Sequence, residues 1–139
     1  MTAPVYKVLA ADDDPTVALL MPLALPAGSF SVTMVDNGNE ALAEFLRADY
    51  DLVLLDVEMP GLDGFEVCAA IRRSHRARVL VVLVSGHSSP ALLARAAELG
   101  ATYLTKPVDW QALGARLEAL LEARLKALFE ASGDQPSPA

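Results

Sequence analysis

The chain is poor in the residues that build disulfides and transition-metal sites. Its 139 residues include one cysteine, Cys68, and two histidines, His75 and His87. A single cysteine cannot form an internal disulfide, so we expect a reducing compartment and a buried helical position for Cys68. With so little histidine and cysteine, a zinc site of the usual ligand set is not expected.

Positive charge and long apolar runs are also scarce. Lys and Arg number 11 against 18 Asp and Glu, a net charge of −7, which argues against direct nucleic-acid binding because phosphate backbones require clustered basic side chains. The apolar run at 79–84 is far too short to span a bilayer. The N-terminal MTAPVYKV lacks the apolar core of a signal peptide. We therefore expect a cytoplasmic protein that contacts neither membrane nor nucleic acid.

The composition is typical of one globular domain, with 53% hydrophobic and 21% charged residues. Short apolar runs, typical of strands, occur at 5–11, 30–35, 51–55, 78–84 and 101–105. Between them lie helical patterns at about 15–25, 39–48, 64–75, 89–99 and 108–131. This alternation predicts an α/β fold, a doubly wound sheet of five parallel strands with five flanking helices.

Turn and cap residues mark the ends of these helices. Capping side chains or turn pairs occur at Asp14-Pro15, Asn37-Gly38, Ser89-Pro90 and Asp109, and Gly100 marks a helix end. The last residues, 132–139, are rich in Gly, Pro and Ser, so we predict a disordered end or a linker there.

Polar side chains follow four of the apolar runs, where each run ends. Asp12 and Asp13 follow the first run, Asp56 the third, Ser85 the fourth and Lys106 the fifth. Because the carboxyl ends of parallel strands meet at one edge of a sheet, we expect these residues to converge there. Clustered carboxylates need a cation, and oxygen ligands without histidine or cysteine favour Mg²⁺. An aspartate beside Mg²⁺ is a plausible phosphoryl acceptor.

Four stretches together identify a family resemblance: VLAADDDP (8–15), VLLDVEMPGLDGFEV (53–67), VLVSG (82–86) and YLTKP (103–107). In order and spacing they resemble the receiver domain of two-component response regulators, the family that includes the chemotaxis regulator, over about residues 5–124. The resemblance implies a flavodoxin-like sheet with strand order 2-1-3-4-5 and a function in phosphorelay signal transduction.

The resemblance also implies a metal and phosphoryl site. Asp56 would be the phosphoacceptor. Asp13, Asp56 and the backbone carbonyl of Glu58 would bind Mg²⁺ directly, and Asp12 would act mostly through metal-bound water.

Further roles follow by position. Ser85 and Lys106 would contact the phosphoryl group. Tyr103 stands at the family's aromatic switch position, whose rotation accompanies a shift of Ser85. Glu58 and His87 stand at the two positions that tune phosphorylation lifetime.

In function, the resemblance implies a switch and not an enzyme, with only assisted self-phosphorylation and self-dephosphorylation. A phosphohistidine of a histidine kinase or histidine phosphotransfer protein would donate the phosphoryl group. The output surface would be the face of the fourth helix, fifth strand and fifth helix. Two alternatives stay open: a phosphatase like the haloacid dehalogenases, and a degenerate receiver that only binds partners. The first expects a second aspartate two residues after the nucleophile, where this chain has Glu58.

The first helical segment departs from the family because 16–28 carries no charge. Helical spacing leaves Leu19, Pro22 and Leu23 outside the core, and Pro22 should kink or shorten the helix. Exposed apolar residues near the active edge are typical of a partner surface. We predict that the phosphodonor docks there.

The last helical pattern is longer than packing on a sheet requires. Leucines between 113 and 130 keep a spacing near the coiled-coil period. We predict a receiver domain at 1–124, then a helical extension and disordered tail or linker at 125–139. The extension would be a dimer helix, or a signalling helix leading to an output domain that this chain lacks. A homodimer could instead form through the face of the fourth helix, fifth strand and fifth helix.

Overall fold

In residues 5–132, which the computed structural model describes, strands and helices alternate as predicted. The strands are β1 (Tyr6–Ala11), β2 (Phe30–Val35), β3 (Leu52–Asp56), β4 (Leu80–Ser85) and β5 (Thr102–Thr105). The helices are α1 (Pro15–Ala24), α2 (Gly38–Arg47), α3 (Gly64–Arg72), α4 (Pro90–Glu98) and α5 (Trp110–Ser132). The tail predicted at 133–139 lies outside the described residues.

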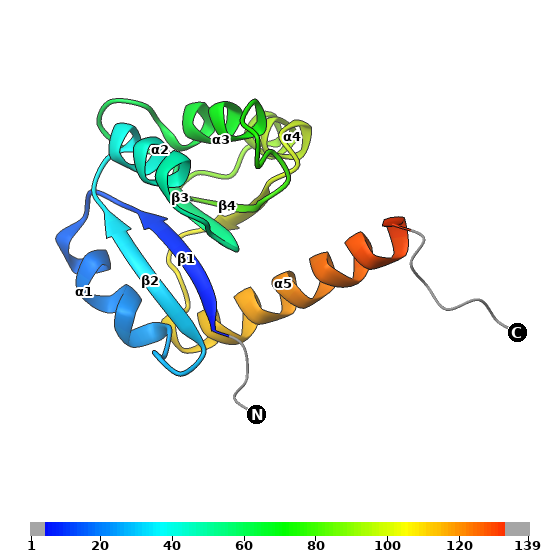
Figure 1. Ribbon diagram of the computed structural model, residues 1–139. Helices are drawn as coiled ribbons and strands as arrows, with labels where there is room; N and C mark the ends of the chain where they lie inside the picture. The colour runs from blue at the N-terminus through cyan, green and yellow to red at the C-terminus, as the bar shows by residue number, and fades with distance from the viewer. Residues whose placement is uncertain (1–4, 133–139) are drawn as a thin grey trace, which may run out of the picture.

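The strands form one parallel sheet of order β2-β1-β3-β4-β5, which confirms the predicted topology. Helices α1 and α5 cover one face of this sheet, and α2, α3 and α4 cover the other (Figure 1). Every residue of β3 and β4 is buried, because these central strands have helices on both faces.

Each face of the sheet has its own apolar core. On the α2–α4 side, Phe45 and Phe65 fill the space under the helices, and Cys68 is fully buried beside them. On the α1 and α5 side, Met21, Leu25 and other buried apolar residues form the second core. The buried thiol of Cys68 confirms the interpretation of that cysteine as a core residue.

The predicted caps are present. Asp14 accepts a hydrogen bond from the backbone N–H of Thr16, and Asn37 and Ser89 cap α2 and α4 in the same manner. The largest boundary error is in the third helix, which was predicted at about 64–75 and ends at Arg72. There the Arg72 guanidinium donates to backbone carbonyls of the following loop and of the loop before β5, and the chain turns.

Helix α5 begins on the sheet and continues past it (Figure 1). Leu113, Leu117 and Leu121 are buried, whereas Leu125 and Leu128 are 56% and 39% exposed. The leucine seam therefore leaves the core after its third turn and continues along the projecting half of the helix. No helix among residues 5–132 is long and apolar enough to cross a membrane.

Candidate functional site

The carboxyl edge of the sheet brings the predicted polar residues together. Ala11 pairs with Leu55, so Asp12 follows β1 beside Asp56 at the end of β3. Asp56 in turn lies opposite Val84, next to Ser85 at the end of β4. The parallel register is therefore the reason that residues far apart in the sequence form one site.

Three carboxylates form the acidic part of this site. One oxygen each from Asp12, Asp13 and Asp56 lies within 4.8 Å of the others. Asp12 and Asp56 are buried, with 7% and 5% exposure, whereas Asp13 is exposed. The backbone N–H of Asp14 donates to Asp12 Oδ1 over 2.9 Å and orients that carboxylate. A set of three close carboxylate oxygens, open to solvent on the side of Asp13, fits a hard divalent cation such as Mg²⁺.

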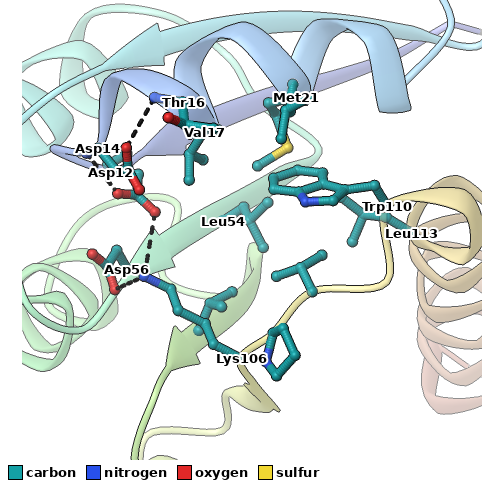
Figure 2. A pocket seen from close by; sticks show the side chains of 16 residues that line it. Asp12, Asp14, Thr16, Val17, Met21, Leu54, Asp56, Lys106, Trp110 and Leu113 are labelled. Atoms are coloured by element: carbon teal, nitrogen blue, oxygen red, sulfur yellow. Dashed lines mark hydrogen bonds and ion pairs between the residues drawn. The ribbon is translucent and has the colours of Figure 1, made fainter.

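Lys106 supplies the positive charge of the site. Its Nζ lies 3.2 Å from Asp56 Oδ1 and 3.7 Å from Asp12 Oδ2 (Figure 2). The backbone of Lys106 is held at the β5–α5 connection, where its N–H donates to the Ser85 carbonyl over 2.8 Å. The Lys106–Pro107 bond that follows is cis. Burial acts to lower the pKa of Lys106, but the charges of Asp56 and Asp12 together raise it.

The carboxyl of Asp56 is the most perturbed acid of the site. Burial, and then the charge of Asp12, raise its pKa to about 6, against the opposing charge and hydrogen bond of Lys106. A carboxylate held in such surroundings is costly for the folded state. Burial and like charge at one carboxyl are typical of functional sites.

The other predicted polar residues, Ser85, Glu58, His87 and Tyr103, form a chain of contacts beside the acid cluster. Ser85 is 1% exposed, and its Oγ accepts a hydrogen bond from the His87 N–H over 3.1 Å. His87 Nε2 lies 3.0 Å from Glu58 Oε1, at the solvent surface. The hydroxyl of Tyr103 donates to the His87 carbonyl, and its ring stacks on Phe65.

The predicted docking residues lie apart from this cluster. Leu19 and Leu23 on α1 are 73% and 79% exposed, and Pro22 between them is exposed as well. The opposite side of the same helix carries Met21, which is buried. The helix ends at Ala24, two residues after its internal proline, in line with the expected shortening.

One feature of the site was missed from the sequence. A cavity of about 510 Å³ extends from Asp12 and Asp56 between α1 and the start of α5. Its apolar walls include Met21, Leu54 and Trp110 (Figure 2). No local pattern marks Trp110 as a residue of the site, because the cavity forms from elements distant in the sequence.

Comparison with known proteins identifies the family. The family model of the response regulator receiver domain matches residues 8–118. The transcriptional regulatory protein ResD of Bacillus subtilis is 34% identical over 116 residues, which are 83% of this chain and 48% of ResD. TcrA of Mycobacterium tuberculosis is 41% identical over 117 residues, which are 82% of this chain and 45% of TcrA. The solved structure of the Vibrio cholerae chemotaxis protein CheY4 has a TM-score of 0.77 and 29% identity, covering 84% of this chain and 98% of CheY4.

The parallel sheet of order β2-β1-β3-β4-β5 and the family match together define the class of protein. The chain belongs to the response regulator receiver domain family, the signalling switches of two-component systems. It spans about half the length of the curated relatives that it matches.

Proposed function

We propose that Asp56 accepts a phosphoryl group from a phosphohistidine of a partner protein and that this modification operates the domain as a switch. The observation that carries the proposal is the placement of Asp56. Its carboxylate ends a buried strand, lies within the three-carboxylate cluster and is 3.2 Å from Lys106 Nζ.

In the proposed transfer, the N–P bond of the phosphohistidine breaks as an O–P bond to Asp56 forms. The histidine nitrogen leaves with the electron pair of the broken bond. Lys106 offsets negative charge on the phosphoryl oxygens, and the Ser85 hydroxyl, at the end of the neighbouring strand, donates to another of them. Such transfer depends chiefly on positioning and on charge stabilisation.

We propose that Asp13, Asp56 and the backbone carbonyl of Glu58 hold Mg²⁺ and that Asp12 contacts it through water. The close carboxylate oxygens support this assignment. When bound, the ion would neutralise charge on the acids and on the phosphoryl oxygens. Asp12 also has a role of its own, since it lies 3.7 Å from Lys106 Nζ and helps to position that ammonium.

The switch that we propose involves Ser85 and Tyr103. The Ser85 Oγ is bonded to the His87 N–H and the Tyr103 hydroxyl to the His87 carbonyl, so both contact the same residue of the β4–α4 loop. A phosphoryl group on Asp56 that drew Ser85 toward it would compete with the His87 N–H for the Ser85 Oγ. The β4–α4 loop would then shift and bias the face of α4, β5 and α5. Glu58 and His87, whose side chains lie 3.0 Å apart at the solvent surface, would tune the lifetime of the phosphate.

Acetyl phosphate and Mg²⁺ test the proposal directly. We expect the intact mass of the protein to increase by one acid-labile phosphate, and we expect no increase for Asp56→Asn. Asp51→Asn, at an exposed aspartate just before the amino end of β3, is the matched control and should be phosphorylated like the wild type.

Other outcomes of that experiment would favour the alternatives. Repeated turnover of a small phosphoester would indicate a phosphatase like the haloacid dehalogenases, and the switch proposal would then be wrong. No modification of the wild type would indicate a degenerate receiver that acts by binding alone.

The partner surfaces are also proposals. We propose that the phosphodonor, a histidine kinase or histidine phosphotransfer protein, docks on the exposed apolar face of α1 at Leu19, Pro22 and Leu23. This face lies next to a groove between Leu23 and Trp110, on the side of the sheet that carries the cavity.

We propose a receiver domain at 1–124 and an extension from 125 that serves a homodimer or leads to an output domain. The exposed leucines Leu125 and Leu128 support this role. Analytical ultracentrifugation should show self-association of the full chain that is weakened by a stop codon after Glu122. Equal monomeric behaviour of both forms, with and without phosphorylation, would contradict the dimer.

A further inference from the structure

A second groove lies at the opposite edge of the sheet from Asp56. It has a volume of about 530 Å³ and runs between the projecting half of α5 and the amino ends of the central strands. Tyr6 of β1, Tyr50 and Asp51 before β3, and the α3–β4 loop line one side, while α5 forms the other. It shares no lining residue with the cavity beside Asp56.

The groove is basic although the protein carries a net charge of −7. His75, Arg76, Arg78 and Arg124 line it, and Asp51 is the acidic residue among the lining residues. The Asp51 carboxylate already accepts a hydrogen bond from the Lys7 N–H over 2.8 Å. Positive charge is therefore concentrated in this groove against the overall charge of the molecule.

Two of these arginines have no partner among residues 5–132. Arg76 is held by Asp49 and by backbone carbonyls, so its charge is compensated. Across residues 5–132, in contrast, the side chains of Arg78 and Arg124 form no hydrogen bond or ion pair. Burial, and then the like charges of Arg72 and Arg78, lower the pKa of Arg124. A half-buried guanidinium beside other guanidiniums is stabilised by a bound anion.

The α5 wall of the groove is apolar. Leu121, Leu125 and Leu128 line it at spacings of four and three residues, so they share one side of the helix over about 10 Å. Such a stripe fits the apolar side of another helix packed along it. A small anion would satisfy the arginines but would leave the stripe exposed.

We propose that this groove binds an acidic amphipathic helix of a partner polypeptide. Carboxylates of that helix would pair with Arg78 and Arg124, and its apolar side would cover Leu125 and Leu128. The charge of the groove selects acidic partners, and the leucine stripe selects helical ones. The binding does not require phosphorylation, so Asp56→Asn should retain it.

A display selection of helical peptides of about 18 residues against the full chain tests this proposal. We expect the enriched peptides to carry Asp or Glu beside a leucine-type stripe. Their affinity, measured by fluorescence anisotropy, should fall at least about tenfold for the Arg78→Ala, Arg124→Ala double variant. Lys126→Ala removes a charge from the same half of α5 but not from the groove, and should change the affinity less than about twofold.

Circular dichroism of each variant verifies that the chain is folded before affinities are compared. The proposal is wrong if no peptide is enriched or if the enriched peptides are basic. It is equally wrong if they bind the double arginine variant as tightly as the wild type, since the groove would then not be their site.

Discussion

Replacing Asp56 by asparagine is expected to stabilise the protein by about 1–3 kcal/mol at neutral pH in the absence of Mg²⁺. The wild-type carboxylate is 5% exposed and lies near Asp12, and its pKa is raised from 3.8 to about 6. That shift corresponds to about 3 kcal/mol when the group is ionised. The opposing charge of Lys106 is already part of that shift, but the buried asparagine amide must itself be hydrogen-bonded, so the net gain is smaller.

The pH dependence follows from the sign of this shift. Below about pH 4 the carboxyl is protonated in both the folded and the unfolded state, and it costs no stability. As the pH rises from about 4 to about 6, the unfolded chain loses the proton while the folded chain keeps it, so wild-type stability falls. Asp56→Asn has no such group, and its advantage should therefore grow across this window and stay constant above it.

Urea denaturation across this pH range measures the difference. Mg²⁺ should stabilise the wild type by binding the folded state, and it should stabilise Asp56→Asn less, because one ligand is lost. Asp36→Asn, at an exposed position, should follow the wild-type curve. If wild type and Asp56→Asn differ by the same amount at every pH, the buried charge of Asp56 is not the cause.

The double variant Leu19→Glu, Leu23→Glu is expected to slow phosphotransfer from a phosphorylated histidine-containing partner by at least about tenfold. Both leucines are largely exposed, so the free protein should remain folded. Covering one leucine side chain at an interface is worth about 1.5–3 kcal/mol, and a tenfold effect needs about 1.4 kcal/mol. Two buried charges in their place would add a desolvation cost.

Transfer reactions that are quenched at successive times and separated on phosphate-affinity gels measure the rate of phosphotransfer. Acetyl phosphate needs no docking surface, so the variant should accept phosphate from it at the wild-type rate. Leu46→Glu, at a leucine of α2 that is 50% exposed, serves as the control and should leave both reactions unchanged. A normal transfer rate from the protein partner in the folded double variant would eliminate α1 as the docking surface.

Much of the fold could be predicted from local patterns. The continuously apolar runs around Val53 and Val82 indicate central strands, because only a sheet covered on both faces buries every position. The caps at Asp14 and Ser89 mark helix starts by the hydrogen bonds that their side chains accept. The end of α3 was harder to predict from the sequence, since it depends on the contacts of Arg72 with a distant loop.

The candidate site was predictable for a related reason. Asp12, Asp56 and Lys106 each end or follow a strand, and parallel strands deliver their carboxyl ends to one edge. The sequence by itself therefore determined which polar groups meet, because alternation and strand-end position are local properties. The tertiary structure alone decided the cavity beside Trp110 and the contacts of His87. It also decided the groove lined by Arg78 and Arg124, which have no partner among the described residues 5–132. These features depend on how helices seat against the sheet and on which charges lack counter-charges, and both are set by packing between segments far apart in the chain.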